Sequence, residues 1–428
     1  MASPLTTPSR IETPKGLRLH IGLFGRRNAG KSSLVNALTN QQISIVSDVA
    51  GTTTDPVEKA CEFAPLGPVV FIDTAGIDDV GELGAMRTAR SISVLGWMDI
   101  ALIVCDCGGL TEYEIQLLDY VKKHNIPCVT VLNKSDVAMP SPELIESLSH
   151  YDCPVVITAA AVRRGMDELR AAIVSVAQTK TDPDRPLMGN LVSPGDTVLL
   201  VTPIDTGAPK GRLILPQVQA IREILDSDAK CIVAKENRVA ETLANEKTPV
   251  KFVVTDSQAV MNVCAQTPQD IPVTTFSIQM AYSKSDLTEM ARGAAMLAFL
   301  KPGDKVMICE TCSHHPQPDD IGRKKIPRWL AKVVGGELDI DVVVGKDFPS
   351  DLSAYKMIIQ CGGCVVTRRH MISRVMQAVE QNIPMTNYGV AISYLQGVLP
   401  RALQLHPEAL EASREAYAKL EKLHGAKS

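Results

Sequence analysis

The sequence predicts an α/β protein in three parts, and three observations support this. Short apolar runs alternate with helix-length segments between residues 17 and 178, which is the pattern of a parallel sheet covered by helices on both faces. A polar stretch that contains prolines follows, "KTDPDRPLMGNLVSPGD", and it is typical of a linker. The same alternation returns from residue 249 onward. We therefore predict domains at 1–178, 179–248 and 249–428.

Composition and charge are those of an ordinary globular protein. The 428 residues are 45% hydrophobic and 21% charged, and a net charge of −4 gives no basic field of the kind that attracts nucleic acid. No apolar run reaches the roughly 20 residues that a membrane-spanning helix needs. Residues 1–16 lack the apolar core of a secretory signal. We expect a cytoplasmic protein that binds neither nucleic acid nor membrane.

The elements of the first domain can be assigned in order along the chain. Strands are predicted at "HIGLF", "VVFID", "IALIV", "CVTVL" and "VVIT", and helix-length segments separate them. Such spacing is typical of parallel strands, because a parallel connection needs a long crossover.

The later elements follow the same logic. "TVLLVTPI" and "KCIVA" are predicted strands on either side of the helical "LPQVQAIREILD", and this middle block is either a spacer or a contact surface for another chain. "VKFVVTD", "PVTTFSI", "DKVMIC", "IDVVV" and "YKMIIQC" predict a second parallel sheet. The tail "PEALEASREAYAKLEKLHG" predicts a helix that Gly425 ends. No internal repeat is evident.

A phosphate-binding loop is predicted between the first strand and the first helix. The segment "GRRNAGKS", residues 25–32, follows "HIGLF" and precedes the helical "SLVNALTN". Its glycines let backbone amides approach phosphate, and the helix N-terminus adds a positive dipole. Lys31 is placed to reach the β- and γ-phosphates, and Ser32 to bind Mg²⁺. The nucleotide contacts predicted here are Gly25, Asn28, Ala29, Gly30, Lys31, Ser32 and Ser33.

Three further motifs at strand ends indicate a guanine nucleotide. In "DTAG", Asp73 can hold the metal through water and Gly76 can meet the γ-phosphate. In "NKSD", Asp136 can accept the two N–H donors of guanine, while Asn133 connects this loop to the phosphate loop. "TAAA" ends the strand "VVIT", where the edge of the base is expected. The contacts predicted from these motifs are Asp73, Gly76, Asn133, Lys134, Asp136, Thr158 and Ala159.

On these four motifs, the first 178 residues resemble the G domains of the tRNA-modification and Era-like GTPases. The resemblance implies that "SDVAGTTTD" is a switch region with Thr53 as a Mg²⁺ ligand. It also implies that Asn28 binds K⁺, as in the potassium-activated members. Ile77 stands where Ras-like enzymes have glutamine, which implies slow hydrolysis helped by K⁺. Glu82 joins Lys31 and Thr53 as a candidate catalytic residue, and the alternative for Glu82 is a solvated charge.

The eleven cysteines are too few for a disulfide scaffold in a chain of this length. Most, such as Cys128, lie in apolar runs where a free thiol packs as a small hydrophobic group. Three lie elsewhere: Cys312 follows the strand "VMIC", and Cys361 and Cys364 follow "YKMIIQ". Because parallel strands direct their carboxyl ends to one edge of a sheet, we expect these three thiols to meet.

The loop around the last two cysteines has features that suit a bound group. Gly362 and Gly363 allow a tight turn and a close approach to the backbone. Thr367 is a suitable N-cap for a following helix. The helix dipole and Arg368 or Arg369 would lower the pKa of nearby thiols and favour thiolates.

Three kinds of site fit these thiols. A redox pair would use Cys361 and Cys364, whose spacing is that of thioredoxin-like motifs. Structural zinc would take Cys309 and Cys312 as well, although Cys309 lies inside an apolar strand. An iron–sulfur cluster would take Cys312, Cys361 and Cys364 and leave one iron for another ligand.

The G domain, the short middle block and the set "CSH" and "CGGC" together resemble the [FeFe]-hydrogenase maturation GTPases, the HydF family, over nearly the whole chain. The resemblance implies a P-loop GTPase domain, a small α/β dimerisation domain and a C-terminal parallel α/β iron–sulfur domain. It implies that Cys312, Cys361 and Cys364 bind a [4Fe–4S] cluster. Gln360 stands where the family often has histidine, so His314, an exogenous ligand or water is left as the fourth iron ligand.

The resemblance also implies a function. The chain would be a homodimeric scaffold that receives a diiron precursor from two radical-SAM maturases and passes it to apo-[FeFe]-hydrogenase. GTP hydrolysis with Mg²⁺ and K⁺ would be the reaction that it catalyses itself. The alternative is a zinc-stabilised GTPase that acts in RNA modification or ribosome assembly, which the acidic balance disfavours. A pure adaptor with an inactive G domain is disfavoured because every phosphate-loop residue is present.

Overall fold

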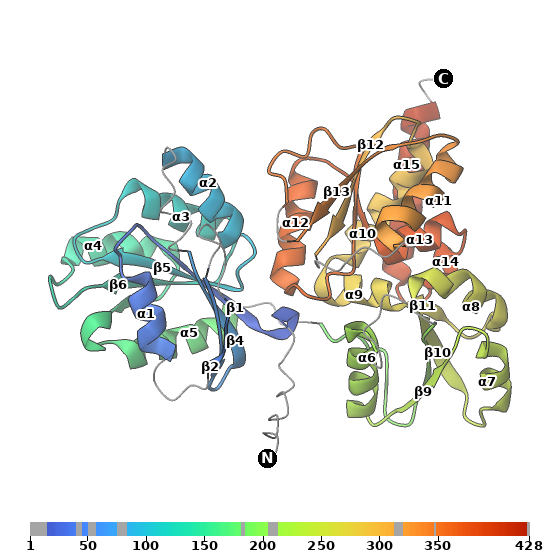
Figure 1. Ribbon diagram of the computed structural model, residues 1–428, viewed down its shortest axis with the longest axis horizontal. Coiled ribbons are helices and arrows are strands. Elements are labelled where there is room, and N and C mark those ends of the chain that lie inside the picture. The colour runs from blue at the N-terminus through green and yellow to red at the C-terminus, as the bar shows by residue number, and fades with distance from the viewer. Residues whose placement is uncertain are drawn as a thin grey trace, which may run out of the picture. The chain divides into compact units, whose positions relative to one another are not determined.

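The computed structural model divides into two compact units, Met1–Pro183 and Asp184–Ser428, which are described one at a time (Figure 1). The residues that the structure describes are 15–39, 45–49, 57–74, 84–180, 185–203, 213–311, 320–345 and 348–425.

The first unit contains a seven-stranded sheet in the order β2-β3-β4-β1-β5-β6-β7. The parallel strands are β1 (Leu19–Phe24), β4 (Gly67–Asp73), β5 (Ile100–Asp106), β6 (Cys128–Asn133) and β7 (Val155–Ile157). They are the strands that the sequence predicts, and they are mostly apolar because both faces of the sheet are covered.

An antiparallel edge extends this sheet, and the sequence analysis did not predict it. β2 (Ile45–Val49) pairs with β3 (Val57–Phe63), and β3 pairs with β4, both antiparallel. The sheet is therefore mixed rather than wholly parallel. β3 is not recognisable as a strand in the sequence "VEKACEF", because charged residues interrupt the apolar positions and only part of the strand is buried.

Helices cover both faces of the sheet and build a core on each. α1 (Lys31–Thr39) and α5 (Met166–Lys180) pack on one face, and α2 (Gly84–Leu95), α3 (Glu112–Lys123) and α4 (Pro142–Leu148) on the other. One thiol differs from expectation, because Cys128 is bonded to Cys153 instead of being free.

The second unit contains two four-stranded parallel sheets. The first consists of β8 (Thr197–Val201), β9 (Lys230–Ala234), β10 (Val250–Thr255) and β11 (Val273–Thr275), and the second of β12 (Lys305–Glu310), β13 (Asp339–Val344), β14 (Met357–Gln360) and β15 (Met385–Asn387). Because β10 is hydrogen-bonded to β8, the predicted boundary between residues 248 and 249 falls inside one sheet. Composition alone does not reveal this, since the boundary follows a short helix, α7 (Val239–Asn245).

The two sheets are built alike, so the second unit contains a repeat that the sequence analysis did not detect. In each sheet the strands lie in the order fourth, third, first, second along the chain. Each repeat opens with Pro-Gly-Asp, where Gly195 and Gly303 both have φ +84°. Pro272 and Pro384 precede the fourth strands, and each accepts a backbone hydrogen bond of 2.9 Å from the third. The two prolines lie in similar segments, "QDIPVT" at 269–274 and "QNIPMT" at 381–386.

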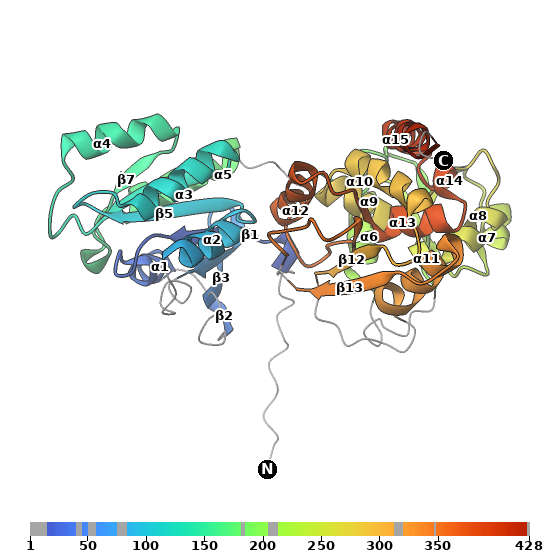
Figure 2. The ribbon, with the colours of Figure 1, turned by 90° about the horizontal axis from the view of Figure 1, so that it is seen from above.

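The helices of the second unit pack around and between its sheets. They are α6 (Leu215–Asp226), α7, α8 (Val260–Gln266), α9 (Phe276–Lys284), α10 (Leu287–Ala294), α11 (Ile326–Val334), α12 (Arg368–Glu380), α13 (Tyr388–Leu395), α14 (Leu399–Ala402) and α15 (Pro407–Gly425). α11 and α12 pack on opposite faces of β12 and β14 (Figure 2). The run "PVTTFSI" is strand only as far as Thr275, whose hydroxyl accepts from the Ile278 amide and begins α9.

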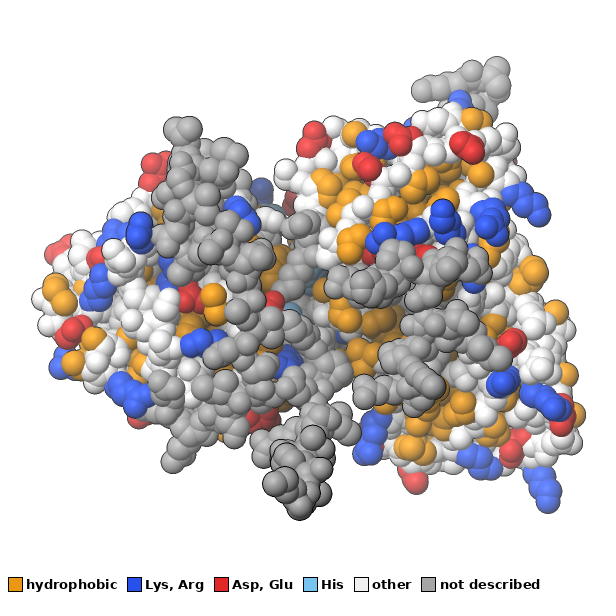
Figure 3. Space-filling view, viewed as in Figure 1, with side chains coloured by type: hydrophobic (Ala, Val, Ile, Leu, Met, Phe, Trp, Pro, Cys, Tyr) orange, Lys and Arg blue, Asp and Glu red, His pale blue; other side chains and the backbone are white. Residues whose placement is uncertain are grey.

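The edge strand β13 is only partly covered. None of its residues is fully buried, and hydrophobic side chains gather over this region of the unit (Figure 3). Among the described residues, no helix is both long enough and apolar enough to cross a membrane.

Candidate nucleotide site and thiol site

The phosphate loop is shaped by residues with positive φ. Gly25 has φ +147°, and a Cβ there would lie 2.0 Å from the carbonyl oxygen of Val104 in β5. Gly30 has φ +95°, and a Cβ there would lie 2.2 Å from Nδ2 of Asn133. Asn28 is also left-handed, with φ +63°. Glycine is therefore required at position 25, where β5 approaches the loop closely, and at position 30, where Asn133 approaches it.

The charged and hydroxyl groups of the loop gather around one open pocket. Lys31 is buried, and its Nζ donates to the carbonyl oxygens of Gly25 and Arg26, so the ammonium lies across the loop. Ser32 Oγ donates to Asp73 Oδ2 at 2.5 Å, which joins the two predicted Mg²⁺ ligands of this region. The pocket has a volume of about 420 Å³ and is lined by Arg27, Asn28, Ala29, Gly30, Lys31, Ser32, Ser33 and Lys134.

Asn133 connects the predicted base-binding loops to the phosphate loop. Its Nδ2 donates to the carbonyl oxygen of Ala29 at 2.9 Å. Its Oδ1 accepts from Thr158 Oγ1 and from the Ala160 amide, both at 3.1 Å. Asp136, by contrast, is exposed at the edge of this arrangement. One buried side chain thus fixes three segments, while the carboxylate expected to select guanine remains accessible.

Arg26 and its partners are a part of the site that the sequence analysis missed. Arg26 forms an ion pair of 2.5 Å with Asp106, and its amide donates to Glu114 Oε1 at 3.2 Å. Glu114 is fully buried and also accepts from the Thr111 amide. Burial opposes ionisation of Asp106, but hydrogen bonds from Arg26 and Gly108 outweigh it and lower the pKa of that carboxyl. The one sequence feature that indicates this part of the site is Arg26 itself, a charged residue inside the phosphate loop.

Several predicted switch residues lie outside the described residues. They are Thr53, Gly76, Ile77 and Glu82. Their roles stay predictions. The predicted base-edge residue Ala159 is described and is fully buried.

The second sheet of the second unit brings two of the predicted thiols to its carboxyl edge. Cys361 directly follows β14, and Cys361 and Cys364 are both half-buried. Cys361 Sγ lies 3.2 Å from both the amide and the hydroxyl of Thr311, which follows β12. Thr311 immediately precedes Cys312 in the sequence, so the chain carrying the third thiol starts beside Cys361. Cys312 itself and His314 lie outside the described residues.

The two glycines between the thiols differ in what they require. Gly363 has φ +68°, and a Cβ there would lie 2.6 Å from Met371 Sδ, so a larger residue would strain the backbone and displace the Met371 side chain. At Gly362, the nearest atom to such a Cβ would be Cys364 Sγ at 3.8 Å, which is ordinary contact distance.

Cys309 is in a different environment from the other thiols. It is fully buried in β12, where it packs with Met307, Ile358 and Val375. Burial raises the pKa of its thiol to about 12. Because apolar side chains enclose Cys309 within the strand core, a four-cysteine zinc site that includes it is disfavoured. Among the described residues, to which Cys312 does not belong, no group of three or more His, Cys, Asp or Glu side chains is arranged to hold a metal ion.

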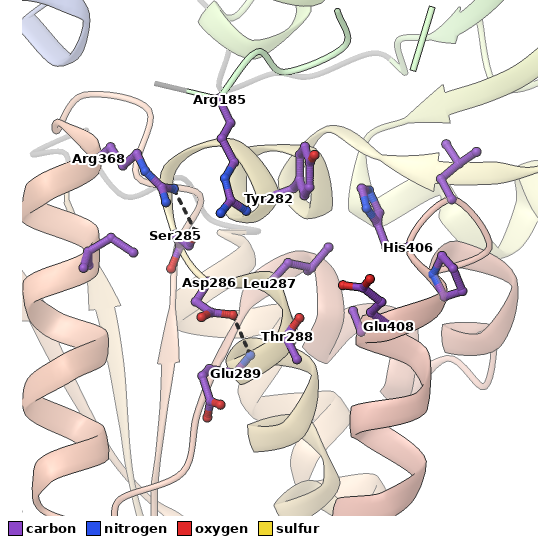
Figure 4. Close-up of a pocket in the computed structure, with 14 residues that line it drawn as sticks. Arg185, Tyr282, Ser285, Asp286, Leu287, Thr288, Glu289, Arg368, His406 and Glu408 are labelled. Atoms are coloured by element: carbon purple, nitrogen blue, oxygen red, sulfur yellow. Dashed lines mark hydrogen bonds between the residues drawn. The ribbon is translucent and has the colours of Figure 1, made fainter. Parts of the chain in front are cut away.

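The loop that carries the thiols is anchored to α9 by two buried cations. Lys284 Nζ donates to the carbonyl oxygen of Val366 at 2.8 Å. Arg368 donates to the carbonyl oxygens of Ser283 and Ser285 at 2.9 and 3.0 Å, and Figure 4 shows this guanidinium directed toward Ser285. Arg368, which we expected beside the thiols, therefore holds the loop in place. Thr367 caps α12 as predicted, by accepting from the His370 amide.

The fold and the first site define a P-loop G domain followed by a unit of two repeated α/β sheets. Residues 20–134 match the 50S ribosome-binding GTPase family. Residues 187–285 match the hydrogen maturase F dimerization domain, and residues 288–405 match the hydrogen maturase F tetramerization domain. The chain belongs to the hydrogen maturase F family. The boundary between these two domains falls between α9 and α10 rather than at residue 248.

Curated relatives and solved structures match less than half of this chain. GTPase Der of a Nitratiruptor species is 36% identical over 168 residues, which are 37% of this chain and 36% of that protein. The tRNA modification GTPase MnmE of a Nostoc species is 35% identical over 168 residues, 38% of this chain and 35% of that protein. The G domain of the T. maritima FeoB iron transporter is 26% identical, with a TM-score of 0.30, and the match covers 38% of this chain and 99% of that one. The chain thus spans about a third of the length of these curated relatives.

Proposed function

We propose that the chain is a GTPase that acts in [FeFe]-hydrogenase maturation as a scaffold and carrier. It assembles or holds a diiron precursor that two radical-SAM maturases supply, and it transfers this precursor to apo-[FeFe]-hydrogenase. The observation that carries the proposal is the meeting of Cys361 with the end of β12 in a chain that also has a complete phosphate loop. We further propose a cytoplasmic homodimer.

GTP hydrolysis is the reaction that the first unit would catalyse. Water attacks the γ-phosphorus, the bond to the β–γ bridging oxygen breaks, and GDP and phosphate leave. Lys31 would exchange its bonds to loop carbonyls for the β- and γ-phosphates, and Asp136 would accept from guanine. Ser32 and Asp73 would hold Mg²⁺, which neutralises phosphate charge when bound. Asn28 is the candidate K⁺ ligand, and Thr53 and Glu82 the candidate switch residues.

The thiol site suits a [4Fe–4S] cluster bound by Cys312, Cys361 and Cys364. Cys361 and Cys364 are accessible thiols on a loop whose turn requires Gly363, and Thr311 brings the chain before Cys312 into contact with Cys361. A cluster supplies an iron with an open coordination position, which His314, an exogenous ligand or water would occupy. The protein's own residues orient the thiols and anchor the loop.

Metal analysis of anaerobically purified and reconstituted protein tests the thiol site. We expect about four irons and four sulfides per chain, as the cluster type requires, and an EPR signal on reduction that Cys364→Ser abolishes. One zinc and no iron would instead support a zinc-stabilised GTPase with an RNA partner. GTP hydrolysis is measured alongside, in K⁺ and in Na⁺ buffers. We expect faster turnover in K⁺, and equal rates would remove the role proposed for Asn28.

A further inference from the structure

Gln360 is a buried polar residue next to the thiol site, and it occupies the position where the family often has histidine. It is the last residue of β14, is fully buried, and precedes Cys361. A fully buried amide must have its donors and acceptor satisfied, because an unmade hydrogen bond costs about 1–3 kcal/mol. The partners of this amide therefore show what the residue does.

The orientation of the Gln360 amide is fixed by the chemistry of its neighbours. Arg374 Nη1 lies 2.9 Å from Oε1 of Gln360, and a guanidinium can only donate. The opposite end, Nε2, lies 3.3 Å from the carbonyl oxygen of Cys309, which can only accept. The same Nε2 lies 3.4 Å from Cys361 Sγ. The amide oxygen thus faces Arg374, and an N–H faces the sulfur.

Arg374 is itself held in place. It is 2% exposed, and its Nη2 donates to the carbonyl oxygen of Gly345 at 2.8 Å. Its guanidinium lies 5.1 Å from the ring centroid of Phe348. A side chain fixed by a carbonyl and a ring cannot easily release the Gln360 oxygen to another partner.

The Cys361 sulfur consequently lies among several donors. The Thr311 amide donates to it at 3.2 Å, the Thr311 hydroxyl lies at 3.2 Å, and Gln360 Nε2 lies at 3.4 Å. A thiolate or a metal-bound sulfur has no proton, so the hydroxyl must donate in that state. Hydrogen bonds to ligating sulfur stabilise added negative charge and raise the reduction potential of a cluster.

We propose that Gln360 is a positioning residue and not an iron ligand. Arg374 holds its amide in the orientation in which Nε2 donates to the Cys361 sulfur. Its oxygen is occupied by Arg374, and its nitrogen carries no available lone pair. Gln360 therefore does not supply the ligand of the iron that cysteine leaves unbound, and that position is left to His314, an exogenous ligand or water. This inference rests on the cluster of the proposed function.

The test compares the full-length wild-type protein with Gln360→Leu, Thr311→Val and Gln360→His, all reconstituted anaerobically. Iron content, the reduction midpoint potential and the EPR spectrum with and without added cyanide are measured. We expect unchanged iron content and a more negative midpoint in both Gln360→Leu and Thr311→Val, since each loses one donor to sulfur. Gln377→Leu is the control, because Gln377 bonds only to Pro349 and Ser350 carbonyls among its described contacts. Its midpoint should equal that of the wild type.

Cyanide reports the open coordination position. We expect cyanide to change the wild-type and Gln360→Leu spectra alike, because the Gln360 amide is not an iron ligand. Gln360→His, whose imidazole can bind iron, is the comparison for a ligand at this position. Thr311→Val is nearly isosteric and keeps the experiment informative if Gln360→Leu fails to fold. Equal midpoints in wild type and variants, or a cyanide response gained only in Gln360→Leu, would overturn the proposal. A wild-type chain that binds no iron overturns the proposed function and this inference together, and the iron content alone distinguishes that case.

Discussion

Gly30 lies in the phosphate loop next to Asn133, and its replacement should destabilise the protein for two separate reasons. Gly30→Ala places a methyl group in a left-handed backbone and 2.2 Å from the Asn133 amide. We expect a loss of about 1–3 kcal/mol in the free energy of unfolding, and at least tenfold weaker GTP binding. Gly109→Ala is the matched control, since Gly109 has φ +128° but nothing within 4 Å of its added Cβ. Chemical denaturation and nucleotide titration measure both effects, and equal losses in the two variants would contradict the steric argument.

Asp136 and Asn133 lie in the same motif but should respond differently to substitution. Asp136 is exposed, so Asp136→Ala should leave the thermal midpoint unchanged and weaken GTP binding by at least tenfold. Asn133 is 2% exposed and bonds to three residues in two other segments, so Asn133→Ala should lose both stability, by about 2–3 kcal/mol, and GTP affinity. Nucleotide titration and thermal unfolding of both variants separate these effects. A destabilised Asp136→Ala protein would show that the carboxylate has a structural partner.

His406 should make the second unit sensitive to acid. Burial lowers the pKa of His406 to about 4 from an ordinary 6.5, so the folded ring stays neutral and accepts from Gln279. The unfolded chain binds a proton below pH 6.5 and the folded chain does not, so stability falls as pH falls from about 6.5 to 4. The loss is at most about 3 kcal/mol. The charged groups that line the same pocket as His406 include Arg185, Asp286 and Glu408.

The measurement is urea unfolding of wild type and His406→Asn between pH 4 and 7.5. The variant should be less stable at pH 7 and should show a shallower dependence on pH below 6.5. Parallel curves for the two proteins across the whole range would mean that His406 is not the titrating group.

At the scale of elements, strands that are apolar along their length can be predicted from the sequence, whereas a strand that mixes charged and apolar residues cannot. β5 is apolar along nearly its whole length because helices cover both sides of it. β3 has charged residues among its apolar ones and is only partly buried, although it lies between β2 and β4, and it escaped prediction. The start of α9 was also misjudged, because the Thr275 cap, and not the apolar pattern, decides where the strand ends.

The contact between α9 and the thiol loop depends on Lys284 at the end of that helix. Lys284 is 1% exposed and donates to the carbonyl oxygen of Val366. Lys284→Met keeps the apolar stem but removes this charge-assisted bond, and we expect a loss of about 1–3 kcal/mol. Lys301→Met is the control at an exposed site and should change stability by no more than about 0.5 kcal/mol. Denaturant unfolding gives both values, and a Lys284→Met protein as stable as the control would show that the buried ammonium costs as much as it contributes.

At the scale of the whole molecule, the phosphate loop can be predicted from the sequence, but the distant residues that hold the sites in place cannot. Short motifs identify Lys31 and Asn133, because backbone approach and guanine recognition require particular residue types. Arg26 and Gln360 act through contacts with residues 80 and 14 positions away, Asp106 and Arg374. No local pattern encodes those pairs. The repeat in the second unit is evident from the strand order, which pairs segments that are distant in the sequence.

The division into two compact units predicts two separate unfolding transitions in the full-length chain. Met1–Pro183 and Asp184–Ser428 each have cores of their own, so each should unfold as a cooperative block. GDP binds only the first unit and should raise only its transition, by about 2.7 kcal/mol when the nucleotide is at 100 times its Kd. Calorimetry with and without GDP measures this, and Asp136→Ala is the control that should lose the shift while keeping both transitions. A single transition that moves as a whole with GDP would show that the two units are energetically coupled, and nucleotide state could then act directly on the thiol site.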